Sequence, residues 1–177
     1  FYMLSSVSAG VETVERADGP HLRFILSGEA HLQFAGKLPV RIPDICLIGP
    51  RNRASYLKLS GPASIFGMGL LPAGWLALAG CPAMTWTDRL GDACSALSGP
   101  VEEAGKRIAR ATSFSEMIKI AEKLLSHAVK RADRPPSQLI RAINGWLADN
   151  LDPRVCDLHD RTGLSESQIQ RQCKALF

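Results

Sequence analysis

Between residues 21 and 70, glycine and proline divide the sequence into short apolar runs, and this spacing constrains the fold more than any other feature. Each run is four to eight residues long, and together they cover residues 21–26, 31–34, 38–42, 45–48, 54–59 and 63–70. Short strands separated by turn residues are typical of small β-sandwiches and barrels. We therefore predict a β-rich region over residues 20–71. The residues before it are weakly patterned and end in the turn signal Asp18-Gly19-Pro20.

The pattern becomes helical after Pro72. Short helices are expected over residues 73–79, 92–97 and 101–111. A longer helix then runs to about residue 131, with Ser113 or Ser115 as its N-cap and Glu116 at its positive end. Its expected buried face consists of Ile118, Ala121, Leu125 and Ala128.

A proline pair, Pro135-Pro136, follows and excludes helix at that point. Beyond it, Ser137 is the expected N-cap of a helix that continues to residue 149, and 150–153 break the pattern. Two further helical stretches lie on either side of Gly163. We therefore predict an α+β protein with one domain over residues 1–134, helical from 72, and an all-α domain over residues 135–177.

The composition is that of an ordinary globular protein, with 177 residues of which 46% are hydrophobic and 21% charged. No apolar run reaches the roughly 18 to 20 residues that a membrane helix needs. The five cysteines are scattered and include no C-x-x-C pair, which favours reduced, packing cysteines and a cytoplasmic protein. Phe1 is not a methionine and Phe177 falls inside a patterned helix, so we expect truncation at both ends.

The net charge of +4 permits an acidic partner without requiring one. Residues 135–177 contain five basic and five acidic side chains, and the basic excess lies around residues 106–134. Charge alone therefore does not point to DNA.

The residues around Gly163 predict a helix-turn-helix. Gly163 can adopt a positive φ, Leu164 can fill the space between the helices, and Ser165 can cap the second helix. Such a second helix lies in the major groove of DNA, where Gln and Arg contact adenine and guanine. The side chains expected to contact DNA are Ser165, Ser167, Gln168, Gln170, Arg171 and Lys174.

Residues 155–174 resemble the first helix-turn-helix of the AraC/XylS transcription regulators of bacteria. Ile169, Arg171 and Lys174 stand at the Leu, Arg and Lys positions of that family's second helix, whereas Cys173 replaces its usual Phe. His159 and Asp160 also depart from the family, which has small residues there. The resemblance implies that Ser167, Gln170 and Arg171 face bases and that a second helix-turn-helix follows in the complete protein.

The N-terminal part resembles a sensor domain that is fused to such regulators. The matching segments are 27–29, 48–50, 66–68, 71–75 and 80–83 with 87–89. We expect a cupin-like small barrel or sandwich here, with a small-molecule effector as a candidate ligand and the helical segment after residue 72 as a candidate element for a homodimer. The resemblance does not assign ligand-binding residues.

Three other features have two interpretations each. His21, Glu29 and His31 lie on adjacent predicted strands, but surface or strand-pairing histidines fit better than a metal site, and we expect no metal. Arg51-Asn52-Arg53 could clamp an anion, although a solvated turn is favoured. Trp75 and Trp86 fit a core better than a ligand pocket.

No nucleophile, phosphate-binding or dinucleotide motif is present, so we expect neither an enzyme nor a cofactor. The favoured hypothesis is a sequence-specific regulator that binds double-stranded DNA, without a membrane, under the control of a ligand or partner. The alternative is a small-molecule-binding module whose C-terminal helices serve packing or dimerisation.

Overall fold

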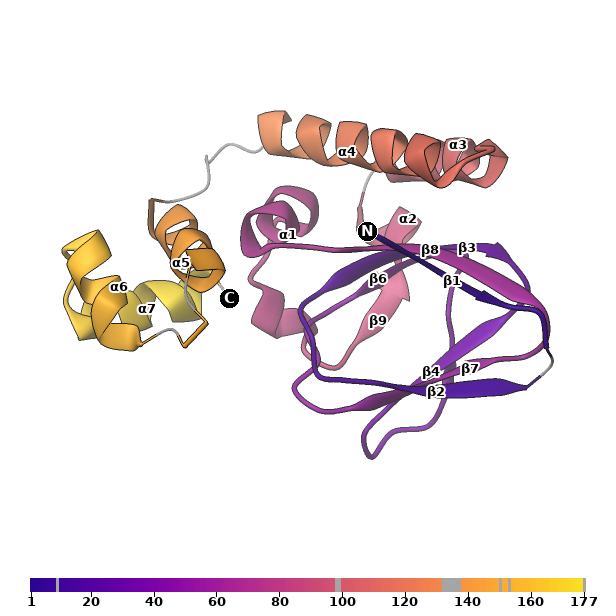
Figure 1. The fold of residues 1–177 in the computed structure, drawn as a ribbon, viewed down its shortest axis with the longest axis horizontal. Coiled ribbons are helices and arrows are strands. Elements are labelled where there is room, and N and C mark those ends of the chain that lie inside the picture. The colour runs from indigo at the N-terminus through magenta and orange to yellow at the C-terminus, as the bar shows by residue number, and fades with distance from the viewer. Residues whose placement is uncertain (9, 98–99, 132–137, 150, 153, 177) are drawn as a thin grey trace.

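The computed structural model describes residues 1–177 except 9, 98–99, 132–137, 150, 153 and 177. It is an α+β fold, as predicted: two antiparallel β-sheets come first and helices follow (Figure 1). The expected proline linker at 135–136 and the Ser137 cap lie outside the described residues.

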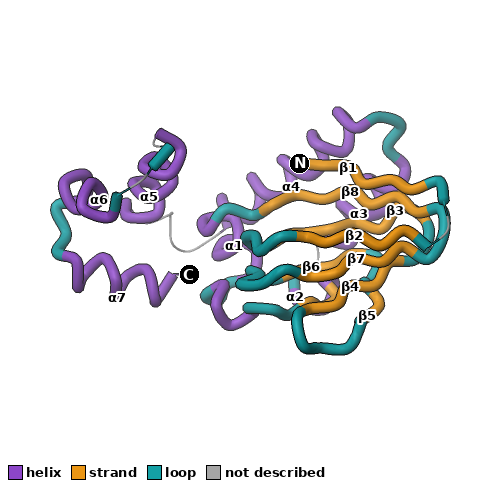
Figure 2. Tube along the Cα trace, turned by 60° about the horizontal axis from the view of Figure 1, so that its bottom comes forward, coloured by secondary structure: helices purple, strands orange, loops and turns teal. Residues whose placement is uncertain are grey.

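The strands form a five-stranded and a four-stranded sheet, which lie one over the other as two layers in Figure 1 and overlap in the turned view of Figure 2. The five-stranded sheet has the order β1-β8-β3-β6-β9, and the four-stranded sheet has the order β2-β7-β4-β5. Their bounds are β1 Tyr2–Ser6, β2 Val11–Glu15, β3 His21–Ser27, β4 Ala30–Phe34, β5 Val40–Arg41, β6 Ile45–Ile48, β7 Ser55–Leu59, β8 Ala63–Gly69 and β9 Leu90–Asp92.

The two sheets differ in burial, and the sequence shows why. β7 alternates strictly between buried and exposed residues, because only one face of the four-stranded sheet is covered. β6 and β8 are nearly continuous apolar runs, since the five-stranded sheet is covered on both faces. Leu32, Leu57 and Ile65 belong to the core between the sheets, whereas Leu22 and Phe66 pack against the helices on the other side.

Most predicted strands are confirmed within one or two residues, but three observed strands were not predicted. β1 and β2 lie in the stretch that is weakly patterned, and they are edge strands whose residues alternate between half-buried and exposed. β9 has only three residues. The run 38–42 was predicted too long, because only Val40–Arg41 pair with β4.

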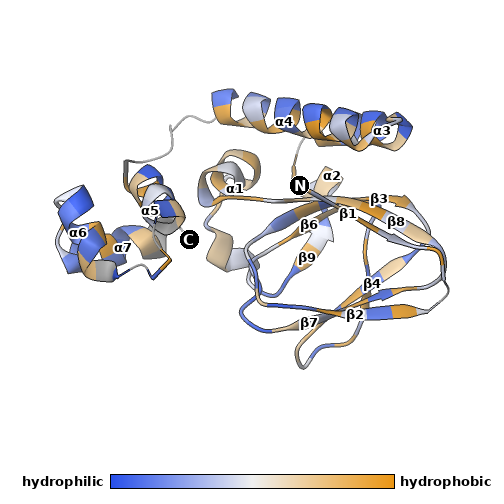
Figure 3. Cartoon of the chain, viewed as in Figure 1, coloured by the Kyte–Doolittle hydropathy of each residue, from blue (hydrophilic) through white to orange (hydrophobic). Residues whose placement is uncertain are grey.

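The helices α1 to α4 cover the five-stranded sheet. α3 and α4 are amphipathic, with their buried residues on one side, whereas α1 is apolar around its circumference, as the hydropathy colouring shows (Figure 3). Their bounds are α1 Pro72–Ala79, α2 Ala93–Ala96, α3 Pro100–Arg110 and α4 Phe114–Arg131, with a 3₁₀ helix, η1, at Ala83–Trp86. Ser113 rather than Ser115 caps α4, because its Oγ accepts from the Glu116 N–H at 3.2 Å. The deepest residues of α4 are Met117, Ile120, Ala121 and Leu124, so the predicted buried face was rotated.

The last three helices have a core of their own. They are α5 Gln138–Asp149, α6 Val155–Thr162 and α7 Glu166–Leu176. Leu139, Ile143, Trp146, Leu158 and Ile169 are buried together there, separately from the two cores of the β-rich part. No helix of the described residues is long and apolar enough to cross a membrane.

Replacing Gly163 by alanine should destabilise the α6–α7 pair by about 1 kcal/mol, because Gly163 ends α6 in the left-handed region, at φ 65°. A Cβ at this position would meet no atom within 4 Å, so the cost is conformational rather than steric. Gly145→Ala, inside α5, is the matched control and should stabilise by roughly 0.5–1 kcal/mol. Urea unfolding followed by circular dichroism measures both. Equal stability of the Gly163→Ala variant and the parent would contradict the assigned turn.

Candidate functional site

The turn between α6 and α7 is built by local hydrogen bonds. The Gly163 N–H donates to the His159 carbonyl at 2.9 Å and ends α6. Ser165 and Gln168 then form a reciprocal cap: the Gln168 N–H donates to Ser165 Oγ at 3.3 Å, and the Ser165 N–H donates to Gln168 Oε1 at 2.8 Å. These bonds set the direction in which α7 leaves the turn.

One side of α7 is buried and the other faces solvent. Ile169 packs against Leu158 and Trp146, and Leu164 adds to the same core, as predicted. Cys173 also contacts this core and is half-buried, and desolvation raises the pKa of its thiol. α7 is therefore held by its apolar side, which leaves the opposite side available to a partner.

The predicted DNA-contacting residues lie on the exposed side of α7. Ser167, Gln170 and Arg171 are exposed, and so are Ser165 and Gln168 at the start of the helix. Because the Gln168 carbonyl oxygen is used in the cap, its side chain is less available to a base than sequence alone predicts. The backbone of Lys174 belongs to α7, but its side chain lies outside the described residues.

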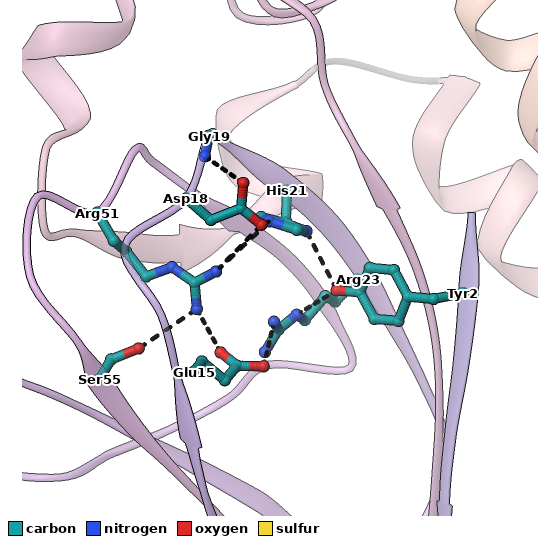
Figure 4. A network of polar contacts seen from close by, with 8 residues as sticks. All are labelled: Tyr2, Glu15, Asp18, Gly19, His21, Arg23, Arg51 and Ser55. Carbon is teal, nitrogen blue, oxygen red and sulfur yellow. Dashed lines mark hydrogen bonds and ion pairs between the residues drawn. The ribbon is translucent and has the colours of Figure 1, made fainter. Parts of the chain in front are cut away.

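A second polar region lies at one end of the space between the two sheets (Figure 4). Buried or half-buried side chains from β1, β2, β3, β7 and the loop after β6 converge there. They are Tyr2, Glu15, His21, Arg23, Arg51 and Ser55, with the more exposed Asp18 at the rim. We call this set the ion cluster.

Glu15 joins the two guanidinium groups of the ion cluster. Its Oε1 accepts from Arg23 Nη2 at 2.6 Å, and its Oε2 accepts from Arg51 Nη1, which also donates to Ser55 Oγ at 3.3 Å. Each arginine side chain is only 2% exposed and Glu15 is 13% exposed. Such charges are kept inside a protein only when they are paired, so Glu15 is what permits two cations between the sheets.

A chain of hydrogen bonds connects Arg23 to the rim. Arg23 Nε donates to the Tyr2 hydroxyl at 2.7 Å, which lies 3.2 Å from His21 Nδ1, and His21 Nε2 lies 2.9 Å from Asp18 Oδ2. Since the Tyr2 hydroxyl accepts from Arg23, its proton is directed to Nδ1, and Nε2–H donates to Asp18. Gly67 leaves room for the Tyr2 ring, because a Cβ there would lie 2.2 Å from Tyr2 Cζ.

Burial and the arginines determine the protonation states in this region. Desolvation lowers the pKa of His21, and the charge of Arg23 lowers it further, so the ring is neutral at pH 7. Desolvation raises the pKa of the Tyr2 hydroxyl. Burial opposes the charge of Arg23, but Tyr2 and Glu15 more than offset it and raise the pKa of Arg23.

The ion cluster corrects one sequence interpretation. Arg51 was favoured as part of a solvated turn, but it is buried and paired, whereas Asn52 and Arg53 are exposed. Sequence reasoning also missed Tyr2, Glu15 and Arg23. The signal available in the sequence was Arg23 inside the apolar run 21–26, because a buried cation requires a charged or hydrogen-bonding partner nearby.

The positions of the histidines and tryptophans bear on the other paired interpretations, and His21 is buried rather than a surface histidine. His21 lies in the five-stranded sheet, whereas His31 lies in the four-stranded sheet and Glu29 pairs with Arg41 at 3.6 Å. Among the described residues, no group of three or more His, Cys, Asp or Glu side chains is placed to hold a metal ion. Trp75 is fully buried, which confirms it as a core residue, and it packs edge-on against Trp86.

The cysteines are less uniformly buried than predicted. All five are free thiols, but only Cys46 is buried and Cys156 is exposed. Desolvation raises the pKa of the Cys46 thiol to about 12. Packing is therefore confirmed as the role of Cys46, and it does not account for Cys156.

A cavity of about 580 Å³ opens beside the ion cluster. Asp18, His21 and Arg51 form its polar side, and apolar residues that include Leu70 and Met84 form the rest. Arg51 Nε is buried and has no hydrogen-bond acceptor among the described residues. The cavity thus combines an apolar lining with a fixed, charged hydrogen-bonding edge, which is typical of small-molecule sites.

No known family profile matches the sequence, and no curated protein matches it either. Solved structures of ToxT from Vibrio cholerae are similar in arrangement. An apo variant of ToxT is 8% identical, with 96% of this chain and 76% of that chain covered and a TM-score of 0.48. ToxT bound to (E)-4-(8-methylnaphthalen-1-yl)but-3-enoic acid is 10% identical, with 95% and 76% covered and a TM-score of 0.47. No conclusion about function follows from a likeness at this level.

Replacing Glu15 by glutamine should destabilise the protein by about 3–5 kcal/mol, because it leaves two buried guanidinium groups without their shared counter-charge. Glu12→Gln is the matched control, since Glu12 lies on the same strand with its side chain exposed, and it should cost less than about 0.5 kcal/mol. Urea unfolding of the three proteins gives both differences. The assigned role of Glu15 is wrong if the two variants are equally stable.

Proposed function

We propose that this chain is part of a sequence-specific, DNA-binding transcription regulator of the AraC/XylS type. Residues 135–177 belong to its DNA-binding domain and residues 1–134 form its regulatory domain. The observation that carries the proposal is the α6–α7 pair, a helix-turn-helix with a left-handed glycine, a capped second helix and exposed Ser167, Gln170 and Arg171. The expected target is double-stranded DNA in the cytoplasm.

The chemistry of α7 suits the edges of bases. An arginine binds the O6 and N7 atoms of guanine in a bidentate manner, and a glutamine binds adenine similarly, each contributing roughly 1–3 kcal/mol of discrimination. Arg171 and Gln170 are adjacent and exposed, while Ile169 anchors the helix from its other side. We assign Arg171 the main base contact, Gln170 and Ser167 supporting contacts, and Lys174 a phosphate contact.

One helix-turn-helix is too small for tight binding. A single module of this size buries roughly 600–1,000 Å² on DNA, and residues 135–177 have equal numbers of basic and acidic side chains. Specific binding therefore requires more contacts, from a second helix-turn-helix in the complete protein or from a second subunit.

The cavity beside the ion cluster is our candidate effector site. It is large enough for a small organic molecule, and Arg51 is held rigidly at its edge by Glu15 and Ser55. An effector with an apolar body and an acceptor oxygen would fill the cavity and bind its charged edge. The same cavity supports the second candidate function, a small-molecule-binding module in which α5–α7 serve packing.

Replacing Arg171 by alanine should weaken binding to the preferred DNA sequence by roughly ten- to a hundredfold, because one bidentate base contact is lost. The preferred sequence is first selected from random duplexes with the protein expressed from its complete gene, and affinities are then measured across a salt series. Arg16→Ala, an exposed arginine after β2, is the matched control and should leave binding unchanged.

Two outcomes would reject the DNA-binding proposal. One is affinity for all duplexes in the nonspecific range, roughly 10⁻⁴ to 10⁻⁶ M. The other is an equal effect of the two arginine substitutions. Either result would favour the small-molecule-binding module.

The cavity is tested with (E)-4-(8-methylnaphthalen-1-yl)but-3-enoic acid, because its apolar rings match the apolar lining and its carboxylate can accept from Arg51. At saturating concentration this acid should raise the melting temperature of the chain, because a ligand that binds only the native state stabilises it. Asn52→Trp places an indole at the cavity wall and should abolish the shift, whereas Arg53→Trp, exposed and outside the wall, should preserve it. A shift that survives Asn52→Trp would place the ligand elsewhere, and no shift would exclude this acid as an effector.

A further inference from the structure

A groove of about 320 Å³ runs between α3 and α4. The two helices form a hairpin on the five-stranded sheet and lie side by side (Figures 1 and 2). Ala104 from α3 and Ile120 and Leu124 from α4 line the groove and are nearly buried, so its floor is apolar.

The rim of the groove is cationic. Arg107, Lys123 and Lys130 line it and are exposed, and Glu103 is its one acidic lining residue. Within the described part of the chain, none of these three cations forms an ion pair. Lys106, by contrast, lies outside this groove and is paired with Glu102 at 2.7 Å.

The lining residues of α4 recur at helical spacing from residue 120 to 130. At 1.5 Å per residue they extend over roughly 15 Å, which is about three turns of a facing helix. A third helix laid in a groove between two others inserts apolar side chains at positions i, i+3, i+4 and i+7. Such apolar side chains would complement the apolar floor, and negatively charged side chains beside them would pair with the unpaired cations of the rim.

Two other occupants fit less well. A phosphate backbone would neutralise the rim but leave the apolar floor unfilled. A second copy related by a twofold axis would place this cationic rim next to an identical cationic rim, in which Glu103 is the one acidic residue available to three cations. Charge complementarity therefore favours an acidic, amphipathic helix.

We propose that the α3–α4 groove binds an acidic amphipathic helix of a partner protein. Apolar side chains of that helix contact Ala104, Ile120 and Leu124, and its carboxylates pair with Arg107, Lys123 and Lys130. The proposal does not depend on DNA binding by α7 or on a ligand in the cavity beside the ion cluster.

The test uses a fluorescein-labelled synthetic peptide of about 18 residues, long enough to form a helix, with leucines on one face and glutamates beside them. Binding to the full chain is measured by fluorescence anisotropy. The peptide should bind, and raising the ionic strength from about 0.05 to 0.3 M should weaken it several-fold, because the rim charges are exposed. A peptide with lysine in place of each glutamate should bind at least about tenfold more weakly.

Groove variants locate the interaction. Arg107→Glu/Lys123→Glu should lower peptide affinity at least about tenfold through charge reversal at the rim. Lys119→Glu, exposed on α4 outside the groove, reverses one charge and should change the affinity less than about twofold. Arg107→Gln/Lys123→Gln removes the two charges without reversing them and should cause an intermediate loss of peptide affinity. It replaces the charge-reversed variant in the test if that variant does not fold.

Three results would overturn the proposal. Equal weakening by Lys119→Glu and the groove variants would mean nonspecific attraction. Absence of peptide binding, with loss of DNA affinity in the groove variants, would assign the groove to nucleic acid. Absence of peptide binding, with a change in sedimentation of the groove variants, would assign it to a second copy.

Discussion

The β-rich part of this protein depends on the neutralisation of two arginines between its sheets. Arg23 and Arg51 would each cost several kcal/mol to bury alone, and Glu15 accepts from both. Glu15 is the last residue of β2, and Tyr2, which accepts from Arg23, is the first of β1. The charges therefore hold the two edge strands with the weakest apolar pattern, and they fix one wall of the adjacent cavity.

Most features that depend on residues close together in the sequence were predicted, whereas features that depend on residues far apart in the sequence were not. Strands β3, β6 and β8 are apolar because the five-stranded sheet is covered on both faces, and their positions could be read directly. The Gly163 turn and the Ser165 cap depend on residues within four positions of each other and were predicted, whereas Gln168 was assigned to DNA and its return bond to the Ser165 N–H was not foreseen. The contact between Glu15 and Arg51 spans 36 positions, and no spacing rule encodes it. For this reason Arg51 resembled a solvated turn until its partners were located.

Polar groups are exposed to solvent on α7 but buried in the ion cluster. In α7, Ile169 and Leu158 bury one side of the helix, so its polar side chains stay hydrated and can exchange water for a partner. In the ion cluster, the polar groups are held inside the sheets, and Asp18 alone is well exposed. Exposed side chains such as Arg171 can adapt to a binding surface, whereas Arg51 can only recognise a ligand that fits its fixed geometry.

The net charge differs between the α3–α4 hairpin and the α5–α7 segment, which indicates that the two would recognise their partners in different ways. Residues 100–131 carry seven basic and four acidic side chains, whereas residues 135–177 carry five of each. If the basic excess served DNA alone, it would be expected on a polar face, but part of it borders the apolar floor made by Ala104, Ile120 and Leu124. Under the proposed function, a neutral α5–α7 segment would obtain its affinity for DNA from directed contacts more than from attraction to phosphates. Specificity in this segment would therefore depend on the orientation of α7, which the Gly163 turn and the Ser165 cap determine.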